Sequence, residues 1–113
     1  MLPKQHRLSL KTEFNRLKKE GKIFQGKFFG LLVAKNQGST PPRFAFIVSN
    51  KIHKKANKRN KVKRLLREAT RDFLLQVKPG TEGVFLAKKT ILEASYPQIK
   101  QEIDDLFKKA GLV

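Results

Sequence analysis

The sequence contains no cysteine and no tryptophan. A chain without cysteine forms no disulfide and offers no thiolate to a metal, which fits a reducing compartment. No apolar run approaches the ~20 residues that span a bilayer, and the first residues lead into polar sequence rather than into a secretory signal. We therefore expect a cytoplasmic protein that has no membrane partner.

Acidic residues are also scarce. Nine of them stand against 26 lysines and arginines, so the 113-residue chain has a formal net charge of +17. Such self-repulsion points to a polyanionic partner, with nucleic acid as the first candidate and a membrane surface as the weaker one. An apolar fraction of 39% and nine phenylalanines suffice for one core. Residues 1–113 are predicted to form a single RNA-binding domain.

The positive charge is concentrated between Lys51 and Arg71, where ten lysines or arginines accompany one acid, Glu68. From Asn60 onward, apolar residues recur with the period of a helix and fall within a sector about 120° wide. These are Val62, Leu65, Leu66, Ala69, Phe73 and Val77. The pattern predicts a helix over residues 60–78 that has one face on a core and cations on the other.

The rest of the chain predicts a small two-layer α/β (α+β) sandwich in the order α-β-β-α-β-α, with a short extra strand at 22–24. Residues 1–11 are predicted to be a basic, irregular lead-in. The loop at 36–42 is short enough for an antiparallel hairpin. Ser95 and Gln98 predict a capping box at the start of the last helix. The other expected elements are a helix at 12–20, strands at 27–34, 43–49 and 83–87, and a turn at 91–94.

The acidic residues form no catalytic pattern. A metal-dependent nuclease needs carboxylates that converge on metal ions, whereas the acids here are isolated in sequence or, as with Asp104 and Asp105, point about 100° apart on a helix. Glu68 and Asp72 are expected to pair with arginines of their own helix or with nearby lysines. We predict no catalytic residue and no metal site in the polypeptide.

The basic stretch predicts phosphate binding, because unpaired cations one helical turn apart repel and do not stabilise a fold. A merely solvated charged face is the alternative. The phenylalanines are predicted to be mostly core, with one or two left to stack on nucleotides. The candidate RNA-binding residues are Lys51, Lys54, Lys55, Lys58, Arg59, Asn60, Lys61, Lys63, Arg64, Arg67 and Arg71.

Two central segments, 48–52 and 58–68, resemble the signature of the bacterial ribonuclease P protein subunit. The flanks agree in the right order over nearly the whole chain: Glu13-Phe14 with Gly21, Lys78-Pro79-Gly80, Ala94-Ser95-Tyr96 and Leu106-Phe107-Lys108-Lys109-Ala110-Gly111-Leu112.

The resemblance implies the non-catalytic protein subunit of an endoribonuclease whose large RNA carries the active site. That enzyme removes the 5′ leader of precursor tRNA by magnesium-dependent hydrolysis, and the RNA holds most of the magnesium ions. The protein would bind this RNA and the single-stranded leader, without an obligate protein partner.

The resemblance also implies a fold like that of one domain of a small-subunit ribosomal protein. Its basic helix lies in a left-handed β-α-β crossover, although such crossovers are almost always right-handed. The leader cleft would lie between the first helix and the open face of the sheet, where Phe14, Lys18 and Ser49 are the expected leader-binding residues.

Four positions depart from the family's pattern. Lys61 stands for an arginine and loses the bidentate fork. Lys18 and Leu32 stand for aromatic residues, and Asn50 stands for a lysine. We therefore expect weaker stacking on the leader and stronger phosphate contacts.

A structural ribosomal or ribosome-assembly protein and a free-standing nuclease remain the rival hypotheses.

Overall fold

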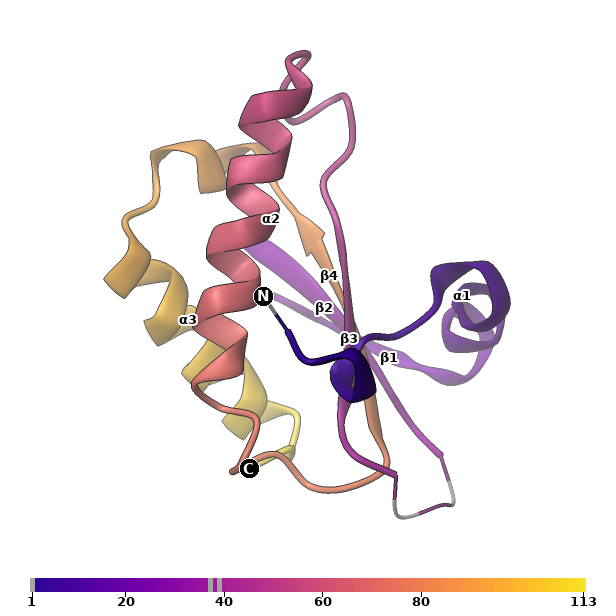
Figure 1. The fold of residues 1–113 in the computed structure, drawn as a ribbon. Coiled ribbons are helices and arrows are strands. Elements are labelled where there is room, and N and C mark those ends of the chain that lie inside the picture. Colours follow the sequence, from indigo (N-terminus) through magenta and orange to yellow (C-terminus); the bar gives the residue numbers. More distant parts are fainter. Residues whose placement is uncertain (1, 37, 39) are drawn as a thin grey trace.

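The computed structural model describes residues 2–36, 38 and 40–113 as a four-stranded sheet with helices on both faces. Helices α2 and α3 cover one face, and α1 lies against the other (Figure 1). The prediction of a mixed α/β fold is confirmed. The helices are α1 (Leu10–Glu20), α2 (Ala56–Arg71) and α3 (Tyr96–Lys109), and the strands are β1 (Lys22–Gln25), β2 (Phe29–Lys35), β3 (Arg43–Ile47) and β4 (Thr81–Ala87), with 3-10 turns at Lys4–His6 and Lys89–Glu93.

The strand order is β1-β2-β4-β3. β2 pairs antiparallel with β1 and β4, and β3 pairs parallel with β4. The predicted hairpin between β2 and β3 is therefore wrong, because β4 lies between them. Gly80, just before β4, bonds to both ends of the connection between β2 and β3. Its carbonyl accepts from the Asn36 N–H at 2.9 Å, and its N–H donates to the Thr40 carbonyl at 2.8 Å.

Gly80 is the residue at which the chain turns into β4. Its φ of +80° lies in the left-handed region, and a β-carbon there would stand 2.9 Å from the Gly38 carbonyl oxygen. A larger residue would be strained by its backbone conformation and by this close approach.

Helix α2 connects β3 to its parallel neighbour β4. The parallel pairing confirms a β-α-β crossover through the basic helix. The left-handedness of this crossover stays a prediction. α2 begins at Ala56 and ends at Arg71, earlier at both ends than the apolar pattern predicts. Residues 72–77 continue in tighter turns, in which the N–H of Phe73 donates to the Thr70 carbonyl and that of Leu74 to the Arg71 carbonyl.

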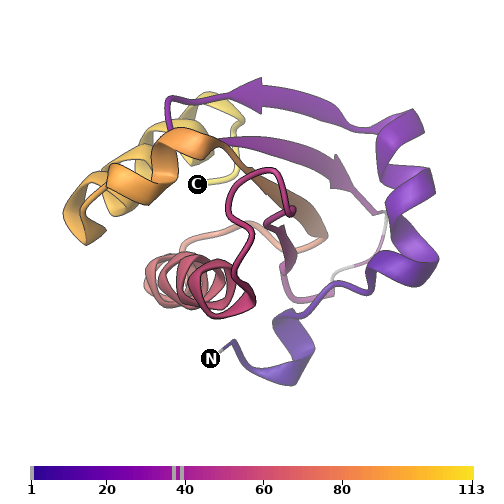
Figure 2. The same ribbon diagram turned by 90° about the horizontal axis from the view of Figure 1, so that it is seen from above.

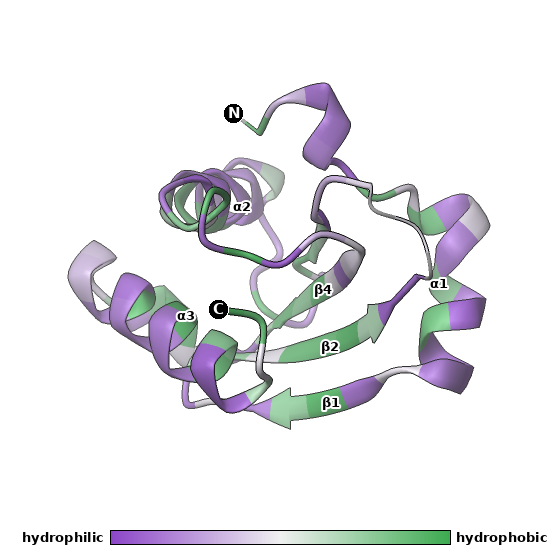
Figure 3. Ribbon diagram, turned by 90° about the horizontal axis from the view of Figure 1, so that it is seen from below, coloured by the Kyte–Doolittle hydropathy of each residue, from purple (hydrophilic) through white to green (hydrophobic). Residues whose placement is uncertain are grey.

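The core has two parts, one on each face of the sheet. Between the sheet and α2 and α3, aromatic rings form the centre, with Phe85 within 6.2 Å, centroid to centroid, of Phe29, Phe44, Phe46 and Phe107. Under α1 the second part is aliphatic and contains Leu17, Leu32, Ala34, Ala45 and Val84. In Figure 3 most of β2 is hydrophobic and much of α2 is hydrophilic, and the buried residues of α2, such as Leu66, pack into the part of the core that also contains α3.

A buried carboxylate fastens α1 to the sheet. Glu82 of β4 has no solvent exposure and accepts from Arg16 of α1, Nη2 to Oε1 at 2.5 Å, and from Arg43 of β3. Arg16 also pairs with Glu13 and Glu20 on its own helix. The hydrogen bond with Glu82 is the main reason why the pKa of Arg16 is raised. The position of α1 over the sheet is thus set by ions as well as by apolar packing.

Candidate nucleic-acid interface

The outward side of α2 is a face of cations, which we call the cationic face and define as Asn60, Lys61, Lys63, Arg64, Arg67 and Arg71. Val62, Leu66 and Ala69 are buried on the opposite side, so the predicted division of the helix is confirmed. Asn60, Lys61, Arg64 and Arg71 are exposed, whereas Lys63 and Arg67 are half-buried. Among the described residues, no cation of this face forms an ion pair with a carboxylate.

Part of the cationic face is concave. Asn60, Arg64, Arg67 and Glu68 line a hollow of about 250 Å³ on the outside of the helix. Its lining offers amide and guanidinium N–H groups, which donate hydrogen bonds to anionic oxygens such as those of phosphate, and one carboxylate at the edge.

The loop before α2 forms a second, more open hollow of about 500 Å³. Lys51, Lys54 and Lys55 line it, and the structure adds Lys89, which lies far away in sequence. His53 lines the same hollow, and its Nδ1 accepts from the backbone N–H of Lys55 at 3.1 Å. Lys58 is also exposed, on the first turn of the helix.

Arg59 is a candidate RNA-binding residue, and in the structure it also stabilises the loop before α2. Its Nη1 donates to the carbonyl oxygens of His53 and Lys54, each at 2.8 Å. The side chain therefore holds the lysine-rich loop against the first turn of α2, which leaves fewer of its N–H groups for RNA.

Two of the predicted leader-binding residues, Phe14 and Lys18, belong to α1, which lies on the other side of the sheet from α2 (Figure 2). Phe14 of α1 is half-buried, and the Nζ of Lys18 stands 4.5 Å from its ring centroid in a cation–π contact. Leu32, at a family aromatic position, is buried under α1. Ser49 is exposed just beyond β3. Of the nine phenylalanines, Phe14, Phe24 and Phe73 are half-buried and the other six are buried.

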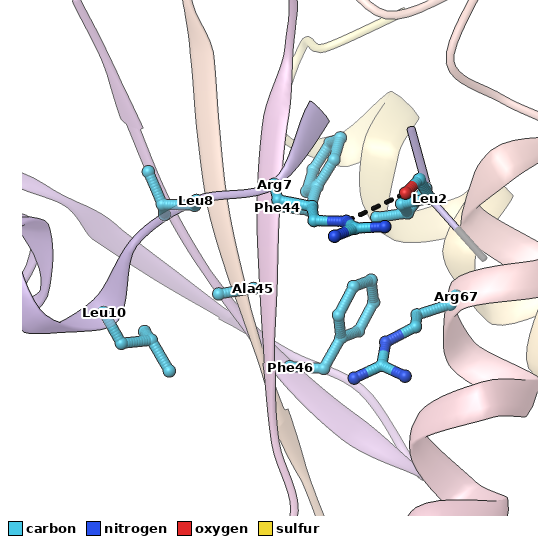
Figure 4. A pocket seen from close by; sticks show the side chains of 8 residues that line it. All are labelled: Leu2, Arg7, Leu8, Leu10, Phe44, Ala45, Phe46 and Arg67. Carbon is cyan, nitrogen blue, oxygen red and sulfur yellow. Dashed lines mark hydrogen bonds between the residues drawn. The ribbon is translucent and has the colours of Figure 1, made fainter. Parts of the chain in front are cut away.

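The N-terminal segment places beside α2 a basic residue, Arg7, that the sequence did not single out. Arg7 lines a cavity of about 300 Å³ together with Arg67 of α2 and apolar residues of three segments (Figure 4). The lead-in was expected to be irregular, yet Leu2 and Leu8 are buried. The signal available in the sequence was the spacing of leucines among the cations at residues 2, 8 and 10.

Asp72 was predicted to pair with an arginine of its own helix or with a nearby lysine, and its partner is a lysine. Its carboxylate accepts from Lys100 of α3, Oδ2 to Nζ at 2.9 Å. This hydrogen bond lowers the pKa of Asp72 and raises that of Lys100. The pairing crosses from the end of α2 to α3 and leaves the arginines of α2 without this partner.

Within residues 2–36, 38 and 40–113, no group of three histidine or acidic side chains is placed to hold a metal ion. In the same part of the chain, no helix is both long and apolar enough to cross a membrane.

Comparison with known proteins gives a consistent result. A family model described as Ribonuclease P matches residues 2–111. The "Ribonuclease P protein component" of Symbiobacterium thermophilum is 32% identical over 112 residues, which cover 99% of this chain and 96% of that protein. The protein of the same name from Picosynechococcus sp. is 33% identical over 109 residues, which cover 96% and 93%.

Solved structures agree with the sequence relatives. The RNase P protein from Thermotoga maritima superposes with a TM-score of 0.82 at 30% identity, over 91% of this chain and 96% of that chain. The Staphylococcus aureus RNase P protein gives a TM-score of 0.85 over 96% and 98%, at 23% identity, which supports the fold alone.

Proposed function

Because the chain belongs to the ribonuclease P protein family, we propose that it binds the catalytic RNA of ribonuclease P and the 5′ leader of precursor tRNA. Membership makes it a component of an endoribonuclease complex that acts in tRNA processing, with RNA as its partner. The proposal concerns how the protein contributes to that complex.

The cationic face of α2 carries the proposal. Its cations lie on a regular helix without carboxylate partners in the described chain, so the charge there is free to interact with phosphate. A row of such groups neutralises phosphates of two RNA strands and allows the strands to lie side by side, since each neutralised phosphate also releases a condensed counterion.

The leader would lie on the opposite face of the sheet, beside α1. Phe14 and Lys18 form one pair there, and the ammonium already occupies one side of the ring. Lys18 then contacts a leader phosphate, and stacking is limited to the free side of Phe14. Ile47 and Leu86, which are only half-buried on this face, provide apolar surface for bases without reading their sequence.

The chemistry would belong to the RNA. The described residues offer no carboxylate or histidine cluster for magnesium, so the residues present do not fit a protein metal site. Magnesium ions would be held mainly by RNA phosphates, and the protein would raise the affinity of the complex for substrate by position and charge.

Arg64→Ala tests the cationic face. We expect the variant to bind the catalytic RNA about five- to tenfold more weakly, as one charge-assisted phosphate contact is lost, and the slope of log affinity against log salt to fall by about one unit. The measurement is filter binding over a salt series, with pre-tRNA cleavage at low magnesium as the functional assay.

Lys109→Ala is the matched control, because Lys109 is an exposed lysine of α3, away from the cationic face. It should change neither measurement beyond a small uniform effect. If Arg64→Ala assembles with the catalytic RNA and supports pre-tRNA cleavage as well as the unsubstituted protein does, the proposal is wrong. Co-purification of the protein with ribosomal RNA, rather than with one RNA of a few hundred nucleotides, would favour the ribosomal rival.

A further inference from the structure

The N-terminal segment is fixed along the open edge of the sheet. β3 is an edge strand, and the segment adds to it by a parallel bridge between Arg7 and Phe44, with the N–H of Leu8 donating to the Phe44 carbonyl at 3.0 Å. His6 Nδ1 is 2.7 Å from the Pro42 carbonyl. Leu2 is only 2% exposed. The segment is thereby anchored at both ends.

The cavity of about 300 Å³ lies around the edge of β3, between this segment, the start of α1 and α2 (Figure 4). Its volume is at the lower end of the range of small-molecule sites. Most of the wall is apolar, so a hydrated inorganic ion would leave much of it uncovered. The lining residues are Leu2, Arg7, Leu8, Leu10, Phe44, Ala45, Phe46 and Arg67.

Two guanidinium groups share the cavity. Arg7 and Arg67 reach it from different segments, and both lie near the ring of Phe46 (Figure 4). Arg7 is oriented by its Nε, which donates to the Leu2 carbonyl at 3.0 Å. No carboxylate lines the cavity, and neither arginine forms an ion pair among the described residues. Like charges in a partly enclosed space repel, and an anion between them removes that cost.

We propose that this cavity receives one unpaired nucleotide of a bound RNA. Its phosphate accepts hydrogen bonds from Arg7 and Arg67, whose planar forks suit phosphate oxygens, and its base lies against the apolar wall beside Phe46. Arg67 belongs both to the cationic face and to the cavity, so a strand that follows α2 reaches the cavity without a break. The inference rests on the proposed RNA binding and adds to it a site that grips one base.

A tryptophan reporter tests the base contact, because the chain has no tryptophan of its own. Leu10→Trp places an indole at the half-buried rim of the cavity, on the α1 side of β3 (Figure 4). The full-length variant is titrated with a single-stranded oligouridylate and with an oligomer of equal length and charge whose sugars carry no base. We expect saturable quenching with the first and not with the second. Leu75→Trp, at a fully exposed position, should stay silent with both.

A pair of charge variants tests the phosphate contact. In the Leu10→Trp chain, Arg7→Gln should raise the midpoint of quenching roughly five- to tenfold. Lys4→Gln removes the same charge from the same segment but does not line the cavity, and it should change the midpoint less than about twofold. Arg7→Lys keeps the charge without the fork and should fall between them. Circular dichroism checks that each variant is folded.

The outcomes separate this inference from the proposed function. Fluorescence anisotropy of labelled oligouridylate reports RNA binding independently of the indole. If RNA binds and the indole is silent, or if the base-free oligomer quenches equally, the nucleotide site is refuted while RNA binding stands. If Arg7→Gln and Lys4→Gln act alike, the phosphate contact is refuted. Stronger quenching by a peptide of glutamate and phenylalanine than by RNA would assign the cavity to a protein. If no RNA binds at all, the proposed function itself fails.

Discussion

Glu82 shows how one residue can position a helix, α1, to which it does not belong. Its carboxylate is fully buried between Arg16 and Arg43, each about one-third exposed. Breaking a buried ion pair from one side costs 3–5 kcal/mol when the remaining charge is buried. The cost is smaller here because both arginines reach solvent.

We therefore expect Glu82→Gln to lower the free energy of unfolding by about 2 kcal/mol, as measured by urea denaturation. Glu20→Gln also removes a carboxylate from Arg16, but Glu20 is 60% exposed and its loss should cost less than about 0.5 kcal/mol. In the Glu82 variant, amide hydrogen exchange should accelerate more in α1 than in α2. Equal effects of the two substitutions would show that burial of the carboxylate is irrelevant.

Sequence reasoning recovered some single residues and missed others. The Ser95–Gln98 capping box is present as predicted, with the Gln98 N–H donating to Ser95 Oγ at 3.3 Å. A capping box is a local pattern, so it can be found without the fold. Glu82 and Arg7 have partners 66 and 37 positions away, Arg16 and Phe44, and no local pattern identifies them.

At the scale of elements, α2 and α3 are joined by the pair Asp72–Lys100. Because the pKa of Asp72 is below its ordinary value of 3.8 in the folded chain, the ionised carboxylate favours folding above that pH. This contribution is lost as the pH falls through the lowered pKa.

Asp72→Asn should therefore lower the melting temperature slightly near neutral pH, since both side chains are well exposed. The difference from the unsubstituted protein should vanish in strong acid, where the carboxylate is protonated in both states. Thermal melts over a pH series give this measurement. A difference that persists unchanged at the lowest pH would mean that Asp72 acts through packing rather than charge.

The elements themselves were predictable where periodicity was strong. The apolar stripe identified α2 and its buried face, but it extended the helix to 78 because the 3.6-residue period was continued through residues 72–77. In the structure most hydrogen bonds of these residues span three positions rather than four. The tighter turns bury Leu74 and expose Leu75 completely. Strand pairing was not predictable, because β2, β3 and β4 are all apolar and no local pattern places β4 between the other two. In the structure the strand order and the hydrogen bonds of Gly80 to Asn36 and Thr40 show this arrangement.

At the scale of the whole molecule, the charge of +17 is a cost that anions should relieve. Binding of an anion to the folded state alone stabilises it by about 2.7 kcal/mol when the anion is at 100 times its dissociation constant. We expect millimolar phosphate to raise the melting temperature by several degrees over sodium chloride of equal ionic strength.

The matched control is the double variant Arg64→Gln, Arg67→Gln, in which this rise should shrink because two of the proposed phosphate ligands are gone. Identical melting of the unsubstituted protein in the two salts would show that self-repulsion is screened without any specific site.

The place of β4 inside the sheet also has a consequence for synthesis. A ribosome that has released the chain only as far as Gly80 has delivered three strands and the entire basic helix, but not the strand that joins β2 to β3. Until β4 leaves the exit tunnel, β2 and β3 each present an unpaired edge, and the apolar side of α2 has no completed sheet to cover. The nascent chain therefore exposes its basic helix to the surrounding RNA before it can close its own core.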